Sequence, residues 1–335
     1  MEQSLYLECS AGVSGDMLVA ALLDAGASQE ELMRVLNNLP VQGFTIEISR
    51  VKKSGLDACD FNVMLDAEHD GHDHDMEYLY GHLGGAAAAN EAAAANEAAA
   101  AENAVYGHTH AHTHSGEHIY ACGSEHEHVA EHEHVAERNH EHSIEHNHAY
   151  AAEHNHTHEH SHEHRGLAEI FAIINASNAT SGAKAIARRT FEILAQAEAK
   201  AHGVSVEEVH FHEVGAVDSI VDIIAASVCL DNLSPQNVYV PKLCEGQGSV
   251  RCQHGILPVP VPAVTNIVQA CGIPLSIINV HGELVTPTGA AFVAAVRTKA
   301  QLPETFTITR VGLGAGKRTY PETSGLLRAF VIVVE

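Results

Sequence analysis

Apolar and polar residues alternate along several short stretches of this chain, and stretches with helical spacing separate them. Before residue 66 the pattern predicts strands at 4–9, 44–51 and 58–65 and helices at 17–25 and 29–39. After residue 164 it predicts helices at 168–176, 183–202, 263–270 and 292–300, and strands at 237–243, 306–311 and 326–334. We therefore expect an α/β fold of the mixed α+β kind. A strand–helix–hairpin part at 1–65 and a main core at 165–335 would flank a long insert.

The stretch from Val209 to Val214 places apolar residues on one face of a short strand and two histidines on the other. His210 and His212 therefore share a strand face. Imidazoles at this spacing suit a divalent transition metal or proton transfer. They could equally be half-buried strand residues without a chemical role.

The spacing changes to a helical period directly afterwards, and a helix is predicted over 216–230. Asp218 and Asp222 would lie one turn apart near its N-terminus, where the helix dipole favours carboxylates. With Glu213 in the turn before them, the segment offers up to three carboxylates beside two imidazoles. Taken singly, Asp218 could be only a helix-start residue and Glu213 a solvated one, but the combination favours a site.

Three glycine-containing turns are candidates for binding a phosphate group. The first joins the opening strand to a helix, and a helix N-terminus there directs backbone N–H groups at an anion. The second precedes the helix near residue 290, and the third has the pattern Gly-x-Gly-x-Gly followed by Lys-Arg. The alternative for the first two is helix capping. The candidate residues are Gly12, Ser14, Gly15, Asp16, Thr288, Gly289 and Lys317.

Residues 246–262 contain three glycines and then three prolines at alternating positions. Prolines at this spacing predict an extended, rigid loop with few backbone donors. His254 lies within this loop and could be a turn residue or a site residue.

Residues 66–164 have a different composition from the rest of the chain. They contain 23 of the 28 histidines and 20 acidic residues, with Arg138 as their one basic residue. They therefore carry −19 of the net charge of −25. With too little apolar surface for a core, we expect an insert that is disordered or weakly helical. It could be a neutral spacer, but the histidine density favours loose binding of metals such as Ni(II), by residues such as His108, His110, His112, His114, His156, His158 and His160.

Composition also argues against several classes of protein. No basic stripe points to nucleic acid, and no apolar run is long enough to span a membrane. The seven cysteines are odd in number and are never spaced Cys-x-x-Cys. We expect reduced thiols and a cytoplasmic protein.

Five motifs in a fixed order resemble one known family. They are SAGVSGDM, EVHFHEVGAVDSIVDI, HGILPVPVPA, GELVTPTGAA and GLGAGKR, and the resemblance covers nearly all of the chain outside 66–164. The family is that of the nickel insertion proteins of lactate racemase maturation. The resemblance implies insertion of Ni(II) into pyridinium-3,5-bisthiocarboxylic acid mononucleotide by a lyase-class chelatase. Two nickel–sulfur bonds and one nickel–carbon bond would form, and the product would be the nickel-pincer cofactor for an apo lactate racemase-type enzyme.

The resemblance suggests a role for each candidate residue. His210, His212 and Asp218 would bind nickel or act as the base, with Glu213 and Asp222 as further metal ligands. The residues of the glycine turns would bind the nucleotide. Family members use CTP with Mn(II) or Mg(II).

The longer members of this family continue beyond the position of Glu335 with a CTP-binding domain. We therefore consider three arrangements: an insertion enzyme, the metal-binding half of a split enzyme that works with a separate CTP-binding chain, and a nickel storage or delivery protein. A homo-oligomer is compatible with each of them.

Overall fold

The computed structural model describes residues 2–66, 165–211, 216–252 and 254–334. All of them belong to one compact unit. The predicted histidine-rich insert lies outside the described residues, apart from Asp66. Within the described residues no helix is both long enough and apolar enough to cross a bilayer.

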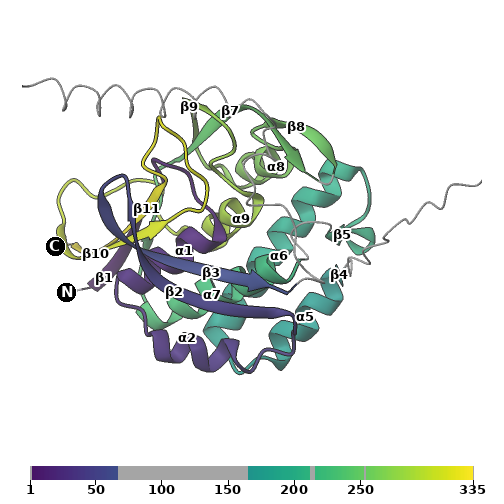
Figure 1. Ribbon diagram of the computed structural model, residues 1–335, viewed down its shortest axis with the longest axis horizontal. Coiled ribbons are helices and arrows are strands. Elements are labelled where there is room, and N and C mark those ends of the chain that lie inside the picture. Colours follow the sequence, from purple (N-terminus) through teal and green to yellow (C-terminus); the bar gives the residue numbers. More distant parts are fainter. Residues whose placement is uncertain (1, 67–164, 212–215, 253, 335) are drawn as a thin grey trace, which may run out of the picture. The chain divides into compact units, whose positions relative to one another are not determined.

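A six-stranded mixed sheet joins the beginning and the end of the chain (Figure 1). Its order is β2-β3-β10-β11-β1-β6, so the hairpin β2–β3 lies beside the last two strands. Cys59 on β3 pairs in parallel with Gly314 on β10, and β1 pairs antiparallel with β11. The strands are β1 (Glu2–Glu8), β2 (Phe44–Lys53), β3 (Leu56–Leu65), β6 (Val238–Tyr239), β10 (Thr307–Ala315) and β11 (Leu326–Val334).

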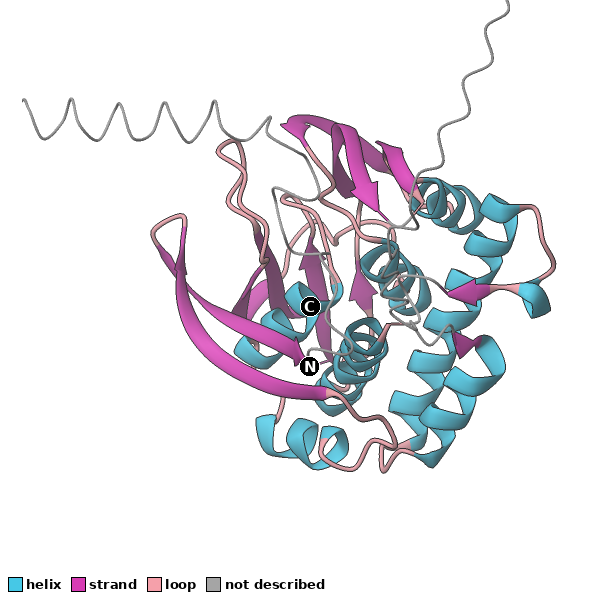
Figure 2. Cartoon of the chain, turned by 45° about the vertical axis from the view of Figure 1, so that its right-hand side comes forward, coloured by secondary structure: helices cyan, strands magenta, loops and turns pink. Residues whose placement is uncertain are grey.

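Seven α-helices occur among the described residues, and Figure 2 shows them gathered beside the strands. They are α1 (Gly15–Asp24), α2 (Gln29–Leu36), α5 (Leu167–Ala176), α6 (Ser181–His202), α7 (Val217–Leu233), α8 (Pro262–Cys271) and α9 (Pro287–Val296). A 3₁₀ turn, η2 (Val206–Glu208), follows α6. The predicted mixed α/β class is confirmed, and most of the predicted helices agree within a few residues.

Two glycines of the Gly-x-Gly-x-Gly motif let α1 pack directly on β10. A Cβ on Gly312 would lie 2.1 Å from Ala21 O, and a Cβ on Gly314 would lie 2.1 Å from Met17 O. Neither distance is compatible with a side chain. These two glycines are therefore part of a strand that holds a helix at close range, while phosphate binding by Lys317 of the same motif stays a prediction.

Helix α7 forms the centre of the core. From Ile220 to Leu230 nearly every residue is buried, because α7 contacts α1, α2 and α6. A helix that is apolar on all sides is typical of the interior of a fold. Near its N-terminus the carboxylate residues Asp218 and Asp222 are only partly buried, which places them at the edge of the core.

The predicted glycine–proline loop is a hairpin of a second sheet. Strands β7 (Leu243–Cys252) and β8 (Gly255–Val259) pair antiparallel, and β9 (Leu275–His281) pairs in parallel with β7. The extended path predicted from the prolines is confirmed in β8, but the glycines that were predicted to begin a loop lie in strand β7. Gly246 allows a close approach of another backbone, since a Cβ there would lie 2.0 Å from Gly282 O. A two-stranded sheet of β4 (Arg165–Gly166) and β5 (His210–Phe211) completes the fold.

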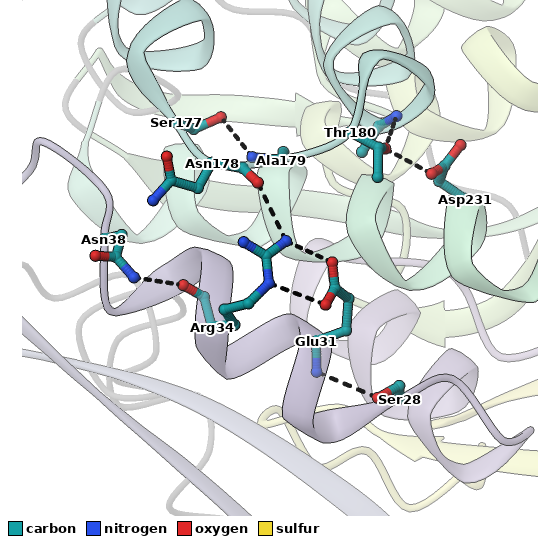
Figure 3. A network of polar contacts seen from close by, with 10 residues as sticks. Ser28, Glu31, Arg34, Asn38, Ser177, Asn178, Ala179, Thr180 and Asp231 are labelled. Carbon is teal, nitrogen blue, oxygen red and sulfur yellow. Dashed lines mark hydrogen bonds and ion pairs between the residues drawn. The ribbon is translucent and has the colours of Figure 1, made fainter.

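Polar contacts connect α2 to the connection between α5 and α6 and onward to α7 (Figure 3). Arg34 donates to both carboxylate oxygens of Glu31 and, at 3.2 Å, to Asn178 O. Thr180, the N-cap of α6, donates to Asp231 Oδ2 at 2.6 Å. These bonds fix α6 and α7 side by side at the ends that lie away from Asp218 and Asp222.

Candidate functional site

A cavity of about 270 Å³ lies where α1, α7 and α9 begin. This is just below the roughly 300 Å³ at which small-molecule sites commonly start. Helix starts from three parts of the chain thus meet at one hollow. The lining residues used below are Ser14, Gly15, Asp16, Asp218, Asp222, Thr286 and Thr288, together with Glu198, His202, Phe211, Cys252, His254, Glu283 and Arg318.

The first two predicted anion turns lie side by side, although about 270 residues separate them in the sequence. Val13 N donates to Leu284 O at 2.9 Å, and Thr286 N donates to Val13 O at 3.1 Å. Gly289 packs against the backbone of Val13, since a Cβ on Gly289 would lie 2.3 Å from Val13 O. The structure therefore brings the starts of α1 and α9 to the same cavity.

Within these turns the predicted residues have different roles. Ser14 is the N-cap of α1 and makes no capping bond with its side chain; its hydroxyl donates to Asp16 Oδ1. The cap of α9 is Thr286, whose Oγ1 accepts from Gly289 N at 3.1 Å, so Thr288 lies in the first turn. Gly12 does not line the cavity. Its φ is +90°, and its backbone packs against Leu284 so closely that a Cβ would lie 2.1 Å from Leu284 O. Gly12 and Gly289 shape the turns without facing the cavity.

Asp222 is the most perturbed carboxylate of the cavity. Burial raises its pKa well above the usual range, and the nearby carboxylates of Asp16 and Asp218 raise it further, while Lys317 opposes them. Its Oδ1 is buried and has no hydrogen-bond partner within the described structure. Gly15 permits this approach, because a Cβ there would lie 2.5 Å from Asp222 Oδ2. The cavity therefore holds three close carboxylates whose mutual repulsion a cation would relieve.

Lys317 does not line this cavity but a smaller one of about 70 Å³ next to it. Its Nζ lies 2.6 Å from Asp60 Oδ1. The neighbouring Arg318 lines both cavities and pairs with Glu283 Oε2 at 2.6 Å. Sequence reasoning chose the lysine of the Lys-Arg pair, but the structure places the arginine at the junction of the two cavities.

The predicted histidines fall only partly within the described structure. His210 has a described backbone in β5, where it pairs with Gly166, and the next residue, Phe211, lines the cavity. His212 and Glu213 lie outside the described residues, as do the seven insert histidines named above. Helix α7 begins at Val217, so Phe211 and Asp218, which both line the cavity, border the undescribed residues on either side in the sequence.

Glu245 is a buried carboxylate that the sequence analysis did not identify. It is fully inaccessible on β7, and its Oε1 accepts from the N–H groups of Gly246, Leu284 and Val285 at 2.7, 2.7 and 3.2 Å. Burial raises its pKa to about 7. The residue holds the segment that carries Glu283 and Thr286 into the cavity wall. A lone glutamate in a glycine-rich stretch gave no local signal of this role.

Four further side chains with metal-ligating atoms line the cavity: Glu198, His202, Cys252 and His254. Of these, the sequence analysis considered only His254 as a site residue. Burial and the neighbouring His202 lower the pKa of His254. As they stand, no three His, Cys, Asp or Glu side chains in the described part of the chain are grouped closely enough to hold an ion.

Comparison with known proteins identifies the family. A family model described as nickel insertion protein matches residues 5–335. The pyridinium-3,5-bisthiocarboxylic acid mononucleotide nickel insertion protein of Alkaliphilus metalliredigens is 39% identical over 333 residues, which cover 99% of this chain and 61% of that protein. The protein of the same name from Acetivibrio thermocellus is 32% identical, over 94% of this chain and 56% of that protein. The one from Geobacillus kaustophilus is 30% identical, over 98% of this chain and 59% of that protein.

The chain therefore spans about three fifths of the length of these curated relatives. No solved structure matches it. Because the family model covers nearly the whole sequence, the chain belongs to the nickel insertion protein family.

Proposed function

We propose that this chain carries the nickel- and nucleotide-binding site of an enzyme that inserts Ni(II) into pyridinium-3,5-bisthiocarboxylic acid mononucleotide. The curated relatives carry this substrate in their names. The observation that carries the proposal is the cavity itself. In this cavity the carboxylates of α7 lie beside the turns at which α1 and α9 begin. The cavity therefore offers carboxylates that can bind a cation and helix N-termini that can bind an anion.

The carboxylates would receive the nickel ion. Asp16, Asp218 and Asp222 are close enough to raise the pKa of Asp222, and a divalent cation would remove this repulsion. In the proposal His210, His212 and Glu213 complete the ligand set. Oxygen and imidazole ligands bind nickel weakly enough to release it to the sulfur atoms of the substrate.

The helix-start turns would hold the mononucleotide. The phosphate would lie at the N-termini of α1 and α9, near Ser14, Gly15 and Thr288. Arg318, which lines both cavities, is better placed than Lys317 to balance its charge. A phosphate next to the aspartates is electrostatically favourable only with the metal ion bound. The metal ion would therefore bind first and the mononucleotide second.

The chemistry requires two sulfur–nickel bonds and one carbon–nickel bond. As the ring carbon bonds to nickel, its C–H bond breaks and a proton passes to a base. Asp218, His210 and His212 are the proposed bases. We further propose that the reaction is of the lyase class, uses CTP with Mn(II) or Mg(II), takes place in the cytoplasm, and supplies an apo lactate racemase-type enzyme.

Mass spectrometry of the bisthiocarboxylate mononucleotide after incubation with the nickel-loaded chain tests this function. Parallel samples contain or lack CTP, and a third contains a separately supplied C-terminal domain of a relative. A nickel adduct formed by the chain alone establishes the insertion site. An adduct that forms only with the added domain identifies a split enzyme. No adduct in any sample contradicts the proposal and favours nickel storage or delivery.

A further inference from the structure

A second group of metal-ligating side chains borders the cavity and has no part in the function proposed above. Glu198 and His202 extend from the last turns of α6, while Cys252 and His254 lie at the turn between β7 and β8. The two segments are distant in the sequence and meet at this cavity.

Their atoms form a continuous row. His202 Nε2 lies 3.6 Å from Glu198 Oε2, the rings of His202 and His254 have centroids 4.9 Å apart, and Cys252 Sγ lies 3.9 Å from His254 Nδ1. Ligands at about 2.0–2.3 Å from a tetrahedral ion are separated by roughly 3.3–3.8 Å. Two of the pairs are thus within a few tenths of an ångström of the spacing that a shared ion requires.

Regular structure supports both segments. Glu198 and His202 are four residues apart on α6, so they share one helix face, and the helix ends directly after them at Gly203 with φ of +68°. Cys252 pairs with Gly255 in the hairpin, which places His254 in the tight turn between them. Because no three of these side chains are grouped closely enough to hold an ion as they stand, binding one ion requires their side chains to rotate.

The row is accessible, unlike the carboxylate of Asp222. The side chain of His202 is 35% exposed and that of Glu198 is 16% exposed. Cys252 is half-buried and His254 is exposed. An ion arriving from solvent would therefore meet the row before the carboxylates at the edge of the core.

We propose that Glu198, His202, Cys252 and His254 form an entry site for a divalent metal ion that prefers sulfur and imidazole ligands. A thiolate with two imidazoles favours Ni(II) or Zn(II) over Mg(II) and Mn(II). On binding, the Cys252 S–H bond breaks, a sulfur–metal bond forms and the proton passes to solvent. That the natural ion is Ni(II), handed on to Asp218 and Asp222, rests on the proposed function.

Alkylation of the full-length chain, resolved by peptide mass spectrometry, tests this site. The chain is treated with iodoacetamide at a series of buffered free Ni(II) concentrations. We expect Ni(II) to protect Cys252 at least tenfold, while Mg(II) does not protect it. Cys271 at the end of α8, likewise half-buried and outside the cavity lining, is the internal control and should react equally with and without nickel.

Two variants connect the protection to the histidines. H202A and H254A should each raise the Ni(II) concentration for half-protection of Cys252 at least tenfold. H281A is the control, because His281 is an exposed histidine at the end of β9 that does not line the cavity. This variant should leave the Ni(II) concentration for half-protection of Cys252 unchanged. The inference would be overturned if Cys252 of the wild-type chain were alkylated equally with and without nickel. It would also be overturned if neither cavity variant altered the protection.

The same samples are assayed for the nickel adduct of the mononucleotide, which separates the two proposals. Protection without adduct means that the metal site stands and the insertion function fails. Adduct without protection means that nickel reaches the carboxylates by another route and the entry site is wrong.

Discussion

Glu245 Oε1 accepts a hydrogen bond of 2.7 Å from the backbone N–H of Leu284, 39 residues later in the chain. Two more backbone donors, Gly246 and Val285, share the same oxygen. The residues that follow Leu284 bridge to Val13 and begin α9. One buried carboxylate on β7 thus holds the segment that brings two helix starts to the cavity.

This arrangement predicts a dependence of stability on pH. Burial raises the pKa of Glu245 to about 7 from its usual 4.5, and the nearby Glu283 adds to the shift. The folded state therefore holds this proton more tightly than the unfolded state does. The contribution of this proton to the free energy of unfolding is fully present below pH 4.5 and is lost as the pH rises through 7. For a pKa shift of this size the contribution is about 3 kcal/mol.

The variant E245Q should remove this part of the pH dependence, because glutamine keeps the acceptor oxygen and carries no charge. We expect the free energy of unfolding of the wild type to fall relative to that of E245Q between pH 4.5 and pH 7. Denaturant unfolding of both proteins at a series of pH values measures the difference, and titration of the insert histidines cancels in the comparison. Parallel curves would contradict the raised pKa.

Gly15 is predicted to be needed for the position of Asp222. In G15A the added Cβ would lie 2.5 Å from Asp222 Oδ2 and would displace the carboxylate. We expect nickel insertion to fall at least tenfold, with a loss of about 1–3 kcal/mol in stability. The control is G166A, whose Cβ meets nothing within 4 Å and which should retain full activity. Unchanged activity in G15A would separate Asp222 from the reaction.

Gly314 is predicted to act in packing and not in phosphate binding. A Cβ there meets the backbone of α1, so G314A should lower the free energy of unfolding by about 2 kcal/mol. Thermal unfolding and mononucleotide affinity should be measured on the same sample. Lost affinity at an unchanged melting temperature would contradict the packing role and would favour phosphate binding by Gly314.

Deletion of residues 69–163 tests the contribution of the histidine-rich segment. With 23 of 28 histidines at 66–164, the deletion should remove most of the bound nickel at saturation. Cofactor synthesis at sufficient nickel should continue, because the cavity residues lie elsewhere. Equilibrium dialysis measures the first quantity and mass spectrometry the second. Loss of synthesis at saturating nickel would favour storage as the main role.

Local patterns in the sequence were sufficient for the elements and for part of the site. The helical period after residue 216 predicted α7 and placed Asp218 and Asp222 one turn apart, as the structure has them. Both features depend only on neighbouring residues. The pairing of Val13 with Val285 depends on the whole fold, and no local pattern encodes it.

Local patterns were misleading for two glycines, and they did not indicate the partners of several polar residues. Gly246 and Gly314 were interpreted as loop residues, but both lie in strands where another backbone approaches too closely for a side chain. Lys317 was chosen for its charge, and the structure shows that Asp60 binds it. His202 and Cys252 were overlooked because the partners that make them notable come from a distant segment.

In the proposed function, the carboxylates at the start of α7 take part in nickel insertion. The most direct measurement compares the yield of nickel-containing mononucleotide for D218N, D222N and D231N, with folding checked by circular dichroism. Asp231 lies on the same helix but bonds Thr180 outside the cavity, so D231N is the matched control. We expect at least a hundredfold loss of yield for D218N and D222N and near wild-type yield for D231N. Wild-type yield from folded D218N and D222N would contradict the proposed function.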